Sequence, residues 1–277
     1  MAGPNYKYYI RSIDVTHDAG VAVVAETDFL GCDFVDYFSV AKIEGKWMIV
    51  NKTYTCTGLT PKPLRLGYWK IRGLIAPVRY VLEYLGVPYV EEMYEQGDAP
   101  EFDRSCWFNV KEKMGLDFPN LPYLIDKDVK ITESSAIFRY VSNEYGTSDF
   151  NGKTDADKAH VDMMFGVVSD IKSAATGHCY GSGDRNAVIE ISNRMEGVQK
   201  FLGDKKFIVG DYVTWVDFFI FEQIELFDYV SEGAFTKKYP GLAAYHHRIA
   251  SLPKFSEYYK SDKFMKKPFN NKIAKIN

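Results

Sequence analysis

The sequence predicts an α+β protein built from three consecutive segments. Residues 1–60 are rich in Val, Ile, Tyr and Phe with little helical periodicity, which is typical of strands. Residues 64–146 alternate strand and helix patterns, and residues 147–277 show helical periodicity almost throughout. Two prolines and a lysine, at 61–63, separate the first two segments and predict a linker there.

The first segment predicts three or four antiparallel strands, over residues 6–15, 21–27, 34–43 and 46–54. Residues 17–20 and 43–45 supply turn residues, so neighbouring strands should pair as a meander. A single sheet of this size has little core of its own, and we expect it to pack on something.

The second segment predicts helices at 76–85 and 134–145 and strands at 64–68, 89–93, 122–125 and 129–131. Gly86 and Pro88 end the first helix, and a polar loop containing Trp107 follows the second strand. The order β-α-β-loop-β-β-α is that of a thioredoxin-like domain, a small mixed sheet flanked by helices.

The third segment predicts an all-α domain with its clearest helices at 157–175, 187–201, 214–227 and 242–251. Thr214 and Asp217 form a capping box at the start of one of them. The stretch 254–275 is basic, and we expect it to be a solvated, frayed tail.

Composition excludes several classes of function. The net charge of −3 over 277 residues argues against nucleic-acid and polybasic membrane partners. There is no apolar run of 18 residues and no signal-like start, so we expect no membrane span and a cytoplasmic location. The four cysteines lie far apart without a CxxC pair, which predicts neither a metal site nor a disulfide framework.

Five motifs, in order, carry a family resemblance. They are Leu66–Leu74, Gly97–Trp107, Leu116–Asp126, Lys130–Ile137 and Val213–Phe218. Together with the domain order, they resemble the cytosolic glutathione transferases, the mu class in particular, over roughly residues 64–267. The resemblance implies a thioredoxin-like glutathione-binding domain at 64–146, an all-α domain with an electrophile pocket at 147–277, and glutathione as co-substrate.

Tyr68 matches the catalytic tyrosine of that family. Glutathione reacts as a thiolate, and a free thiol with a pKa of about 8.5 is mostly protonated at neutral pH. A hydroxyl that donates to the sulfur stabilises the anion, at about 1.4 kcal/mol for each unit by which the thiol pKa falls. The resemblance therefore implies that Tyr68 activates glutathione for attack on small hydrophobic electrophiles. Without the resemblance, a tyrosine after glycine is more often a packing residue.

The resemblance also assigns glutathione contacts position by position, to Trp69, Leu74, Trp107, Lys111, Asn120, Leu121, Pro122, Glu133, Ser134 and Asp170. Trp107 and Lys111 would hold the carboxylate of the glycine end, and Pro122 would be cis, which exposes the backbone of Leu121. Glu133 departs from the mu pattern, which has glutamine there. A carboxylate would attract the γ-glutamyl ammonium and repel the neighbouring carboxylate, which Ser134 can still hold.

The resemblance further implies a homodimer. Asp170 matches a residue that reaches the neighbouring subunit's glutathione, and Phe118 matches an aromatic side chain that inserts into the partner. Ile71, Lys172 and Tyr180 would line the electrophile pocket. The ordinary alternatives are an exposed helical aspartate for Asp170 and a core residue for Phe118.

Alternatives remain open. A non-catalytic ligand-binding or structural relative would keep the fold, although the retained Tyr68 argues against it; a thiol-transferring relative would have cysteine at position 68. Residues 33–52 resemble the last strands of nuclear-transport-factor-like proteins (SnoaL or putative lumazine-binding), whose initial helices are missing here. The first segment is then either an assembly module completed by a second copy or, the interpretation we favour from sequence, a fusion remnant.

Overall fold

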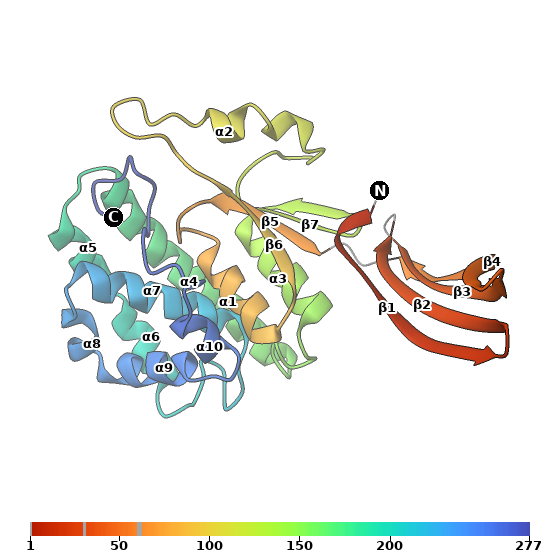
Figure 1. Cartoon of the computed structure of the whole chain (residues 1–277). Helices are drawn as coiled ribbons and strands as arrows, with labels where there is room; N and C mark the ends of the chain where they lie inside the picture. The colour runs from red at the N-terminus through yellow and green to blue at the C-terminus, as the bar shows by residue number, and fades with distance from the viewer. Residues whose placement is uncertain (1, 30–31, 60–62) are drawn as a thin grey trace. The chain divides into compact units, whose positions relative to one another are not determined.

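The computed structural model describes residues 2–29, 32–59 and 63–277, and the chain divides into two compact units, Met1–Pro63 and Leu64–Asn277. The first unit is a four-stranded antiparallel sheet in the order β1-β2-β3-β4 (Figure 1). Its strands are Ala2–Thr16, Ala19–Phe29, Cys32–Ile43 and Lys46–Leu59. The predicted antiparallel meander is confirmed. Of the predicted linker at 61–63, only Pro63 lies within the described residues.

The turn between β3 and β4 shows how the sequence sets the strand register. Ile43 pairs with Lys46, and the two residues between them, Glu44 and Gly45, have positive φ angles of 50° and 78°. Positive φ at both central residues defines the type I′ turn, whose twist suits a two-residue hairpin.

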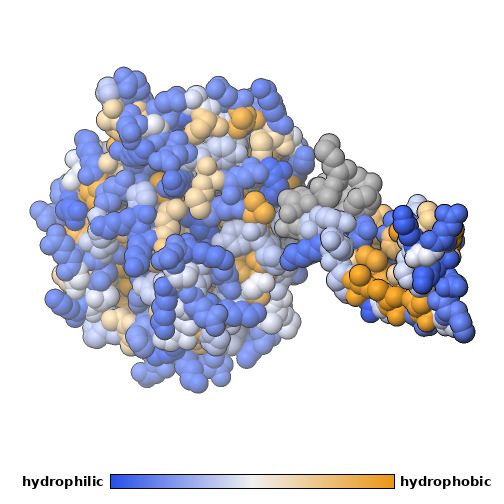
Figure 2. Space-filling model, viewed as in Figure 1, coloured by the Kyte–Doolittle hydropathy of each residue, from blue (hydrophilic) through white to orange (hydrophobic). Residues whose placement is uncertain are grey.

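Few side chains of this sheet are buried. Ala25 and Val35 are the buried apolar residues of its described part, and Asp36, also buried, pairs with Lys52 Nζ at 2.6 Å. Apolar side chains gather instead on the surface of this unit (Figure 2). They include Tyr8, Ile10, Ile13, Trp47, Met48, Ile49 and Tyr54.

The second unit begins with a mixed sheet in the order β6-β5-β7-β8. Its strands are β5 Leu64–Trp69, β6 Tyr89–Tyr94, β7 Tyr123–Asp126 and β8 Val129–Thr132. β5 and β6 are parallel, and the other pairs are antiparallel. Helices α1 (Ala76–Leu85) and α3 (Ser134–Tyr145) pack on each other. The predicted thioredoxin-like domain is confirmed.

The loop that the sequence predicted around Trp107 contains two short helices, α2 (Ser105–Phe108) and the 3₁₀ helix η1 (Lys111–Lys113). Helices of three or four residues have almost no periodic pattern, so no sequence signal predicts them.

The rest of the second unit is helical, as predicted. Its helices are α4 Asp155–Tyr180, α5 Arg185–Ser192, α6 Met195–Leu202, α7 Trp215–Val230, α8 Ala234–Lys238, α9 Pro240–Ala250 and α10 Phe255–Lys260. Helix α7 is buried along nearly its whole length and packs against α1, α4, α5, α8 and α9 (Figure 1). It therefore joins the helical part to the sheet part.

The capping box at the start of α7 is confirmed. The Asp217 carboxylate accepts from Thr214 N at 2.7 Å and, through its other oxygen, from the Tyr245 hydroxyl at 2.6 Å and Ile208 N at 2.9 Å. A buried carboxylate needs such donors, because burial raises the pKa of Asp217.

The prediction of one helix over residues 187–201 is wrong, because the structure has two helices there, α5 and α6. Residues Asn193 and Arg194 donate to Glu190 O and Ile191 O, and Glu196 donates to Asn193 O. These i→i+3 bonds tighten the chain and interrupt the α-helical ladder. Asn193 Oδ1 also accepts from Lys238 Nζ at 2.6 Å, a tertiary contact that the local pattern does not contain.

The prediction of a frayed basic tail at 254–275 is also wrong. It contains α10, and its Phe264 and Phe269 side chains are buried. The aromatic residues spaced among the lysines explain the difference, since they pack into the helical core while the amines stay outside. The Arg72 guanidinium lies 4.1 Å from the centre of the Phe269 ring.

Candidate active site

Tyr68 lies at the end of β5, just before the turn into α1. Its side chain is buried, and its hydroxyl oxygen accepts a hydrogen bond from Leu74 N at 3.2 Å. The turn depends on Gly73, whose φ is +49° and whose added Cβ would lie 2.7 Å from the Tyr68 oxygen. A glycine is therefore required for the phenol to sit against the start of the helix.

The phenol of Tyr68 is a hydrogen-bond donor at neutral pH. Burial raises the pKa of Tyr68 to about 12, although the hydrogen bond from Leu74 opposes that shift. The hydroxyl consequently stays protonated through the range in which a thiol ionises. A protonated phenol can donate to an anion in this site, and the hydrogen bond that its oxygen accepts from Leu74 N orients and polarises it as a donor.

A cavity of about 460 Å³ opens beside Tyr68. It is lined by Tyr68, Ile71, Gly73, Leu74, Lys172, Ser173, Thr176, Gly177, Tyr180 and Asn270. The structure thus gathers around one cavity the residues of the turn and of α4 that the sequence singled out. The cavity has more apolar than polar lining, which suits an uncharged organic molecule.

Lys172 extends from α4 to the turn between β5 and α1. Its side chain is buried, and its amine donates to Gly73 O at 3.0 Å. Burial lowers the pKa of Lys172 to about 8. The Lys172 amine thus holds the Gly73 carbonyl, and the next backbone amide, Leu74 N, donates to the Tyr68 hydroxyl.

Trp107 and the turn before β7 lie side by side. The Leu121–Pro122 peptide is cis, as the resemblance implied. The Trp107 ring stacks on Tyr123, the residue after this proline, with ring centres 5.9 Å apart. Leu121 N donates to the side chain of Asn120 at 2.9 Å, so this amide is occupied by the protein itself.

Four other predicted glutathione residues, Trp69, Lys111, Glu133 and Ser134, do not line the 460 Å³ cavity. Trp69 is half-buried at the end of β5. Lys111 Nζ lies 3.4 Å from a Glu112 oxygen in η1. Glu133 precedes α3 with φ at +69°, an uncommon conformation for a side chain other than glycine, and Ser134 begins the helix. Backbone N–H groups at this helix start can hold an anion.

Two predicted residues lie away from this cavity. Asp170 is exposed on α4, and Phe118 is 80% exposed in the segment before β7. The exposure of Phe118 excludes the alternative that it is a core residue, whereas the exposure of Asp170 fits both a residue that reaches a neighbouring subunit and an ordinary exposed helical aspartate.

The C-terminal stretch contributes residues that the sequence did not suggest. Asn270 lines the cavity, and Asn271 N donates to the Tyr180 hydroxyl at 2.9 Å. Backbone bonds join the same stretch to the catalytic turn, from Arg72 N to Pro268 O at 2.8 Å and from Gly73 N to Phe269 O at 3.0 Å. The repeated Phe at 264 and 269 was the available signal that this stretch packs.

Comparison with known proteins agrees with this geometry. The model of the glutathione S-transferase N-terminal domain matches residues 64–143, and that of the C-terminal domain matches residues 189–262. Glutathione S-transferase Mu 4 of Mus musculus is 37% identical over 216 residues, which cover 76% of this chain and 97% of that protein. Glutathione S-transferase 2 of Gallus gallus is 39% identical over 211 residues, or 73% and 92% of the two chains. The chain belongs to the glutathione S-transferase family.

Solved structures agree with the assignment to the glutathione S-transferases. The crystal structure of the glutathione S-transferase Blo t 8 superposes with a TM-score of 0.69 at 26% identity, covering 76% of this chain and 99% of that one. A Pi-class glutathione S-transferase of Onchocerca volvulus shares the fold, with a TM-score of 0.67 at 23% identity, covering 77% and 100%. Residues 2–55 match the putative lumazine-binding family, so both parts of the predicted resemblance are confirmed.

Within the described residues of this glutathione S-transferase, no group of His, Cys, Asp and Glu side chains is arranged to hold a metal ion. Its described helices include none with the length and apolarity that crossing a bilayer would require.

Proposed function

We propose that this glutathione S-transferase joins the sulfur of glutathione to small hydrophobic electrophiles, with Tyr68 stabilising the thiolate. The observation that carries the proposal is the buried, protonated phenol beside the Leu74 amide at one end of an apolar cavity. The thiol proton leaves to solvent as the thiolate forms. With an aryl halide, the sulfur then forms a C–S bond as the C–halogen bond breaks and halide departs.

Glutathione would be held by the residues around that phenol. Trp107 and Lys111 would donate to the glycine carboxylate, and Ser134 at the start of α3 would hold the γ-glutamyl carboxylate. The backbone of Leu121 would pair with the cysteinyl part once glutathione replaces the Asn120 side chain as the partner of its amide. Pro122, Asn120 and Trp69 would shape this binding surface. Glu133 would attract the γ-glutamyl ammonium, so the pH dependence of glutathione binding should differ from that of a glutamine variant.

A homodimer is part of the proposal. Asp170 would reach the γ-glutamyl ammonium in the neighbouring subunit, and Phe118 would insert into the partner. Their exposure in a single chain supports this arrangement. A cytoplasmic location, which the mu-class resemblance implies, is also part of the proposal.

The test is conjugation of glutathione to 1-chloro-2,4-dinitrobenzene by the intact chain. Tyr68→Phe should lower turnover by roughly 10²-fold, the scale of one lost donor to an anion, while glutathione binding is largely kept. Tyr84→Phe is the matched control, because this ring packs on Phe150 and Phe218 away from the cavity. Intact-chain binding of glutathione without any conjugation would support the ligand-binding alternative, and equal rates for Tyr68→Phe and the parent would refute the role of Tyr68.

A further inference from the structure

Lys172 carries the one amine among the described residues that line the 460 Å³ cavity. Its side chain is buried on α4, and its nitrogen lies 5.6 Å from the centre of the Phe219 ring. The hydroxyl groups of the lining belong to Tyr68, Ser173, Thr176 and Tyr180. A cavity suited to small electrophiles therefore contains a single side-chain amine.

The charge of this amine has no close counter-charge. Among the residues that the structure describes, no carboxylate oxygen lies within 4.0 Å of Lys172 Nζ, which donates to the neutral Gly73 O at 3.0 Å. Glu222 on α7 is the acid whose charge acts on the amine. Its carboxylate is already paired with Arg72 Nη2, at 2.6 Å.

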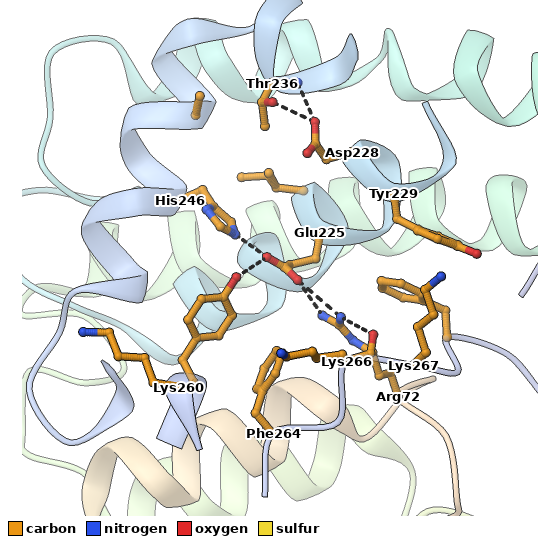
Figure 3. Close-up of a pocket in the computed structure, with 14 residues that line it drawn as sticks. Arg72, Glu225, Asp228, Tyr229, Thr236, His246, Lys260, Phe264, Lys266 and Lys267 are labelled. Carbon is orange, nitrogen blue, oxygen red and sulfur yellow. Dashed lines mark hydrogen bonds and ion pairs between the residues drawn. The ribbon is translucent and has the colours of Figure 1, made fainter. Parts of the chain in front are cut away.

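The larger cavity of the second unit, of about 790 Å³, shows how its other buried charges are arranged (Figure 3). Glu225 Oε1 lies 2.5 Å from His246 Nε2, and Oε2 lies 3.3 Å from Arg72 Nη1 (Figure 3). Both oxygens of this carboxylate thus have a partner, as buried ions usually do. Lys172 differs because a neutral carbonyl is its hydrogen-bond acceptor.

Burial without a close counter-charge keeps part of the Lys172 amine neutral. It lowers the pKa of Lys172 to about 8, although the charge of Glu222 opposes this shift. At pH 7.5 about a quarter of the amine is then neutral, against about 0.1% for an ordinary lysine with a pKa of about 10.4. The neutral form has the lone pair that attacks a carbonyl carbon. Lysines desolvated in apolar pockets form Schiff bases for this reason.

We propose that Lys172 forms an imine with aldehydes in this cavity, and that α,β-unsaturated aldehydes react with the glutathione thiolate as this imine. The amine adds to the carbonyl carbon, one water leaves, and one proton is taken up, which gives a protonated imine. Its one N–H donates to Gly73 O in place of the amine. Formation of the imine is independent of the proposed function, whereas its use in conjugation rests on that function.

The protonated imine makes addition of the thiolate easier, because its positive charge draws electrons from the β-carbon more strongly than a neutral carbonyl does. The sulfur forms a C–S bond at the β-carbon, and the electrons of the C=C and C=N bonds shift to give a neutral enamine. Water then supplies a proton to the α-carbon, which restores the protonated imine. Hydrolysis releases the glutathione-bound aldehyde, the Lys172 amine and the proton taken up at the start.

The amine lies near the phenol that would hold the sulfur. Lys172 Nζ donates to Gly73 O, and the amide of the same peptide group, Leu74 N, donates to the Tyr68 hydroxyl. The two hydrogen bonds and the peptide group between them limit the distance from Nζ to the Tyr68 oxygen to about 9 Å at most. A short enal can therefore have its carbonyl carbon at the amine and its β-carbon beside a sulfur that accepts from the phenol.

Imine formation is tested on the full chain without glutathione, by reductive alkylation with hexanal and sodium cyanoborohydride at pH 7.5. Peptide mapping by mass spectrometry measures the addition of a hexyl group at each lysine. Lys172 should be labelled at least tenfold faster than Lys158, which is exposed on the same helix. Labelling of Lys172 no faster than that of Lys158 overturns the proposal.

Two glycines of α4 test whether the aldehyde reaches Lys172 through the cavity. Gly177 lines the cavity and Gly166 does not, and a Cβ at either position would meet nothing within 4 Å apart from the helix's own backbone. Gly177→Phe puts a ring into the cavity and should slow labelling of Lys172 at least fivefold, whereas Gly166→Phe should leave it within twofold. Both changes raise helix propensity, so both variants should fold. Equal labelling in the two variants contradicts the cavity as the route.

The use of the imine in conjugation is tested with trans-2-hexenal, which can form it, and 1-chloro-2,4-dinitrobenzene, which cannot. Lys172→Arg should lower the ratio of kcat/KM for the enal to kcat/KM for the aryl halide at least tenfold, because a guanidinium stays protonated. Lys158→Arg should leave this ratio unchanged. If Lys172 is labelled and the ratio stays constant, the role of the imine in conjugation is refuted. If the parent conjugates neither compound, the proposed function has failed, and selective labelling of Lys172 still establishes the imine.

Discussion

The two units of this chain differ most in how much apolar surface they bury. Thirteen large apolar side chains are exposed in the described part of the first unit, and nine in the second, which is more than three times as long. The first unit buries only Ala25 and Val35 among its described apolar residues. The second has a continuous core that runs from Leu64 to Ile276. The second unit therefore has what independent folding requires, and a single sheet without such a core does not.

This difference bears on the role of the first unit. A fusion remnant with no partner would be expected to lose exposed apolar side chains, since such patches promote aggregation, whereas an assembly module keeps them. The proposed homodimer also brings two copies of this sheet into one particle, which raises their effective concentration. The exposed side chains thus favour pairing with a second copy over the remnant interpretation.

Separating the units gives the largest expected effect. Residues 64–277 alone should keep the far-ultraviolet circular dichroism of a helical domain and the conjugation activity per subunit. Residues 1–63 alone should be unfolded at low concentration or form oligomers. Sedimentation velocity and circular dichroism over a concentration series measure both fragments.

The outcome also separates the two roles of the sheet. If the intact chain forms larger or tighter assemblies than residues 64–277, the first unit contributes to association. A well-folded monomeric fragment 1–63 would contradict this argument, because the sheet would then be stable although it buries little apolar surface. If the intact chain and residues 64–277 form particles with the same number of subunits, the interpretation of the first unit as a fusion remnant is favoured.

A matched pair of isoleucines sharpens the same comparison within the intact chain. Ile220 on α7 is fully buried and Ile49 on β4 is 62% exposed. Ile220→Ala should lower the free energy of unfolding by about 2–5 kcal/mol, because it removes buried groups and leaves a cavity. Ile49→Ala should change it by less than about 0.5 kcal/mol. Urea unfolding checks both. Trp47 is the one tryptophan of the first unit, and it reports on the sheet separately when Trp69, Trp107 and Trp215 are replaced by phenylalanine.

A concentration dependence would extend this result. If a second copy covers the sheet, the cost of Ile49→Ala should grow as protein concentration rises and dimers form. A large cost for Ile49→Ala at all concentrations would contradict the exposure of this side chain. A negligible cost for Ile220→Ala would contradict the burial of α7.

Local signals were enough to predict much of this fold. Helix α1 ends where Gly86 adopts a left-handed conformation, with φ at 72°, and α3 has the predicted bounds. The Thr214 capping box predicted the start of α7. In each case the decisive contact lies within a few residues of the signal, so the sequence pattern contains it.

The errors arise where distant residues decide. The break at Asn193 depends on Lys238, and the ordered C-terminal stretch depends on Arg72, about two hundred residues earlier. The motifs identified Tyr68 as a site residue, and the position-by-position resemblance assigned Lys172 to the pocket. They gave no indication of Asn270, because its place at the cavity depends on how the C-terminal stretch folds back on the turn between β5 and α1.

The smallest expected effect concerns two lysines, one in each unit, whose pKa values shift in opposite directions. The hydrogen bond to Asp36 raises the pKa of Lys52, whereas burial lowers the pKa of Lys172 to about 8 from an ordinary value of 10.5. Between pH 8 and 10.5 the folded state binds fewer protons at Lys172 than the unfolded state. The free energy of unfolding should therefore rise with pH across this window through Lys172. The contribution of the Lys52–Asp36 pair is present below pH 10.5 and is lost as the pH rises through the raised pKa.

Lys172→Met should remove the rise in the free energy of unfolding between pH 8 and 10.5. It should also increase the free energy of unfolding at pH 7 by about 1–3 kcal/mol, reduced by the contribution of the lost hydrogen bond to Gly73 O. Lys158→Met, exposed on the same helix, is the control and should leave the rise in place. Lys52→Met should lower stability only below the pKa of Lys52, and only in the part of the signal that follows Trp47. A stability profile for Lys172→Met that is parallel to the parent from pH 7 to 11 would contradict a charged-form penalty at this buried amine. The second unit would then accommodate the ammonium as readily as the open sheet does.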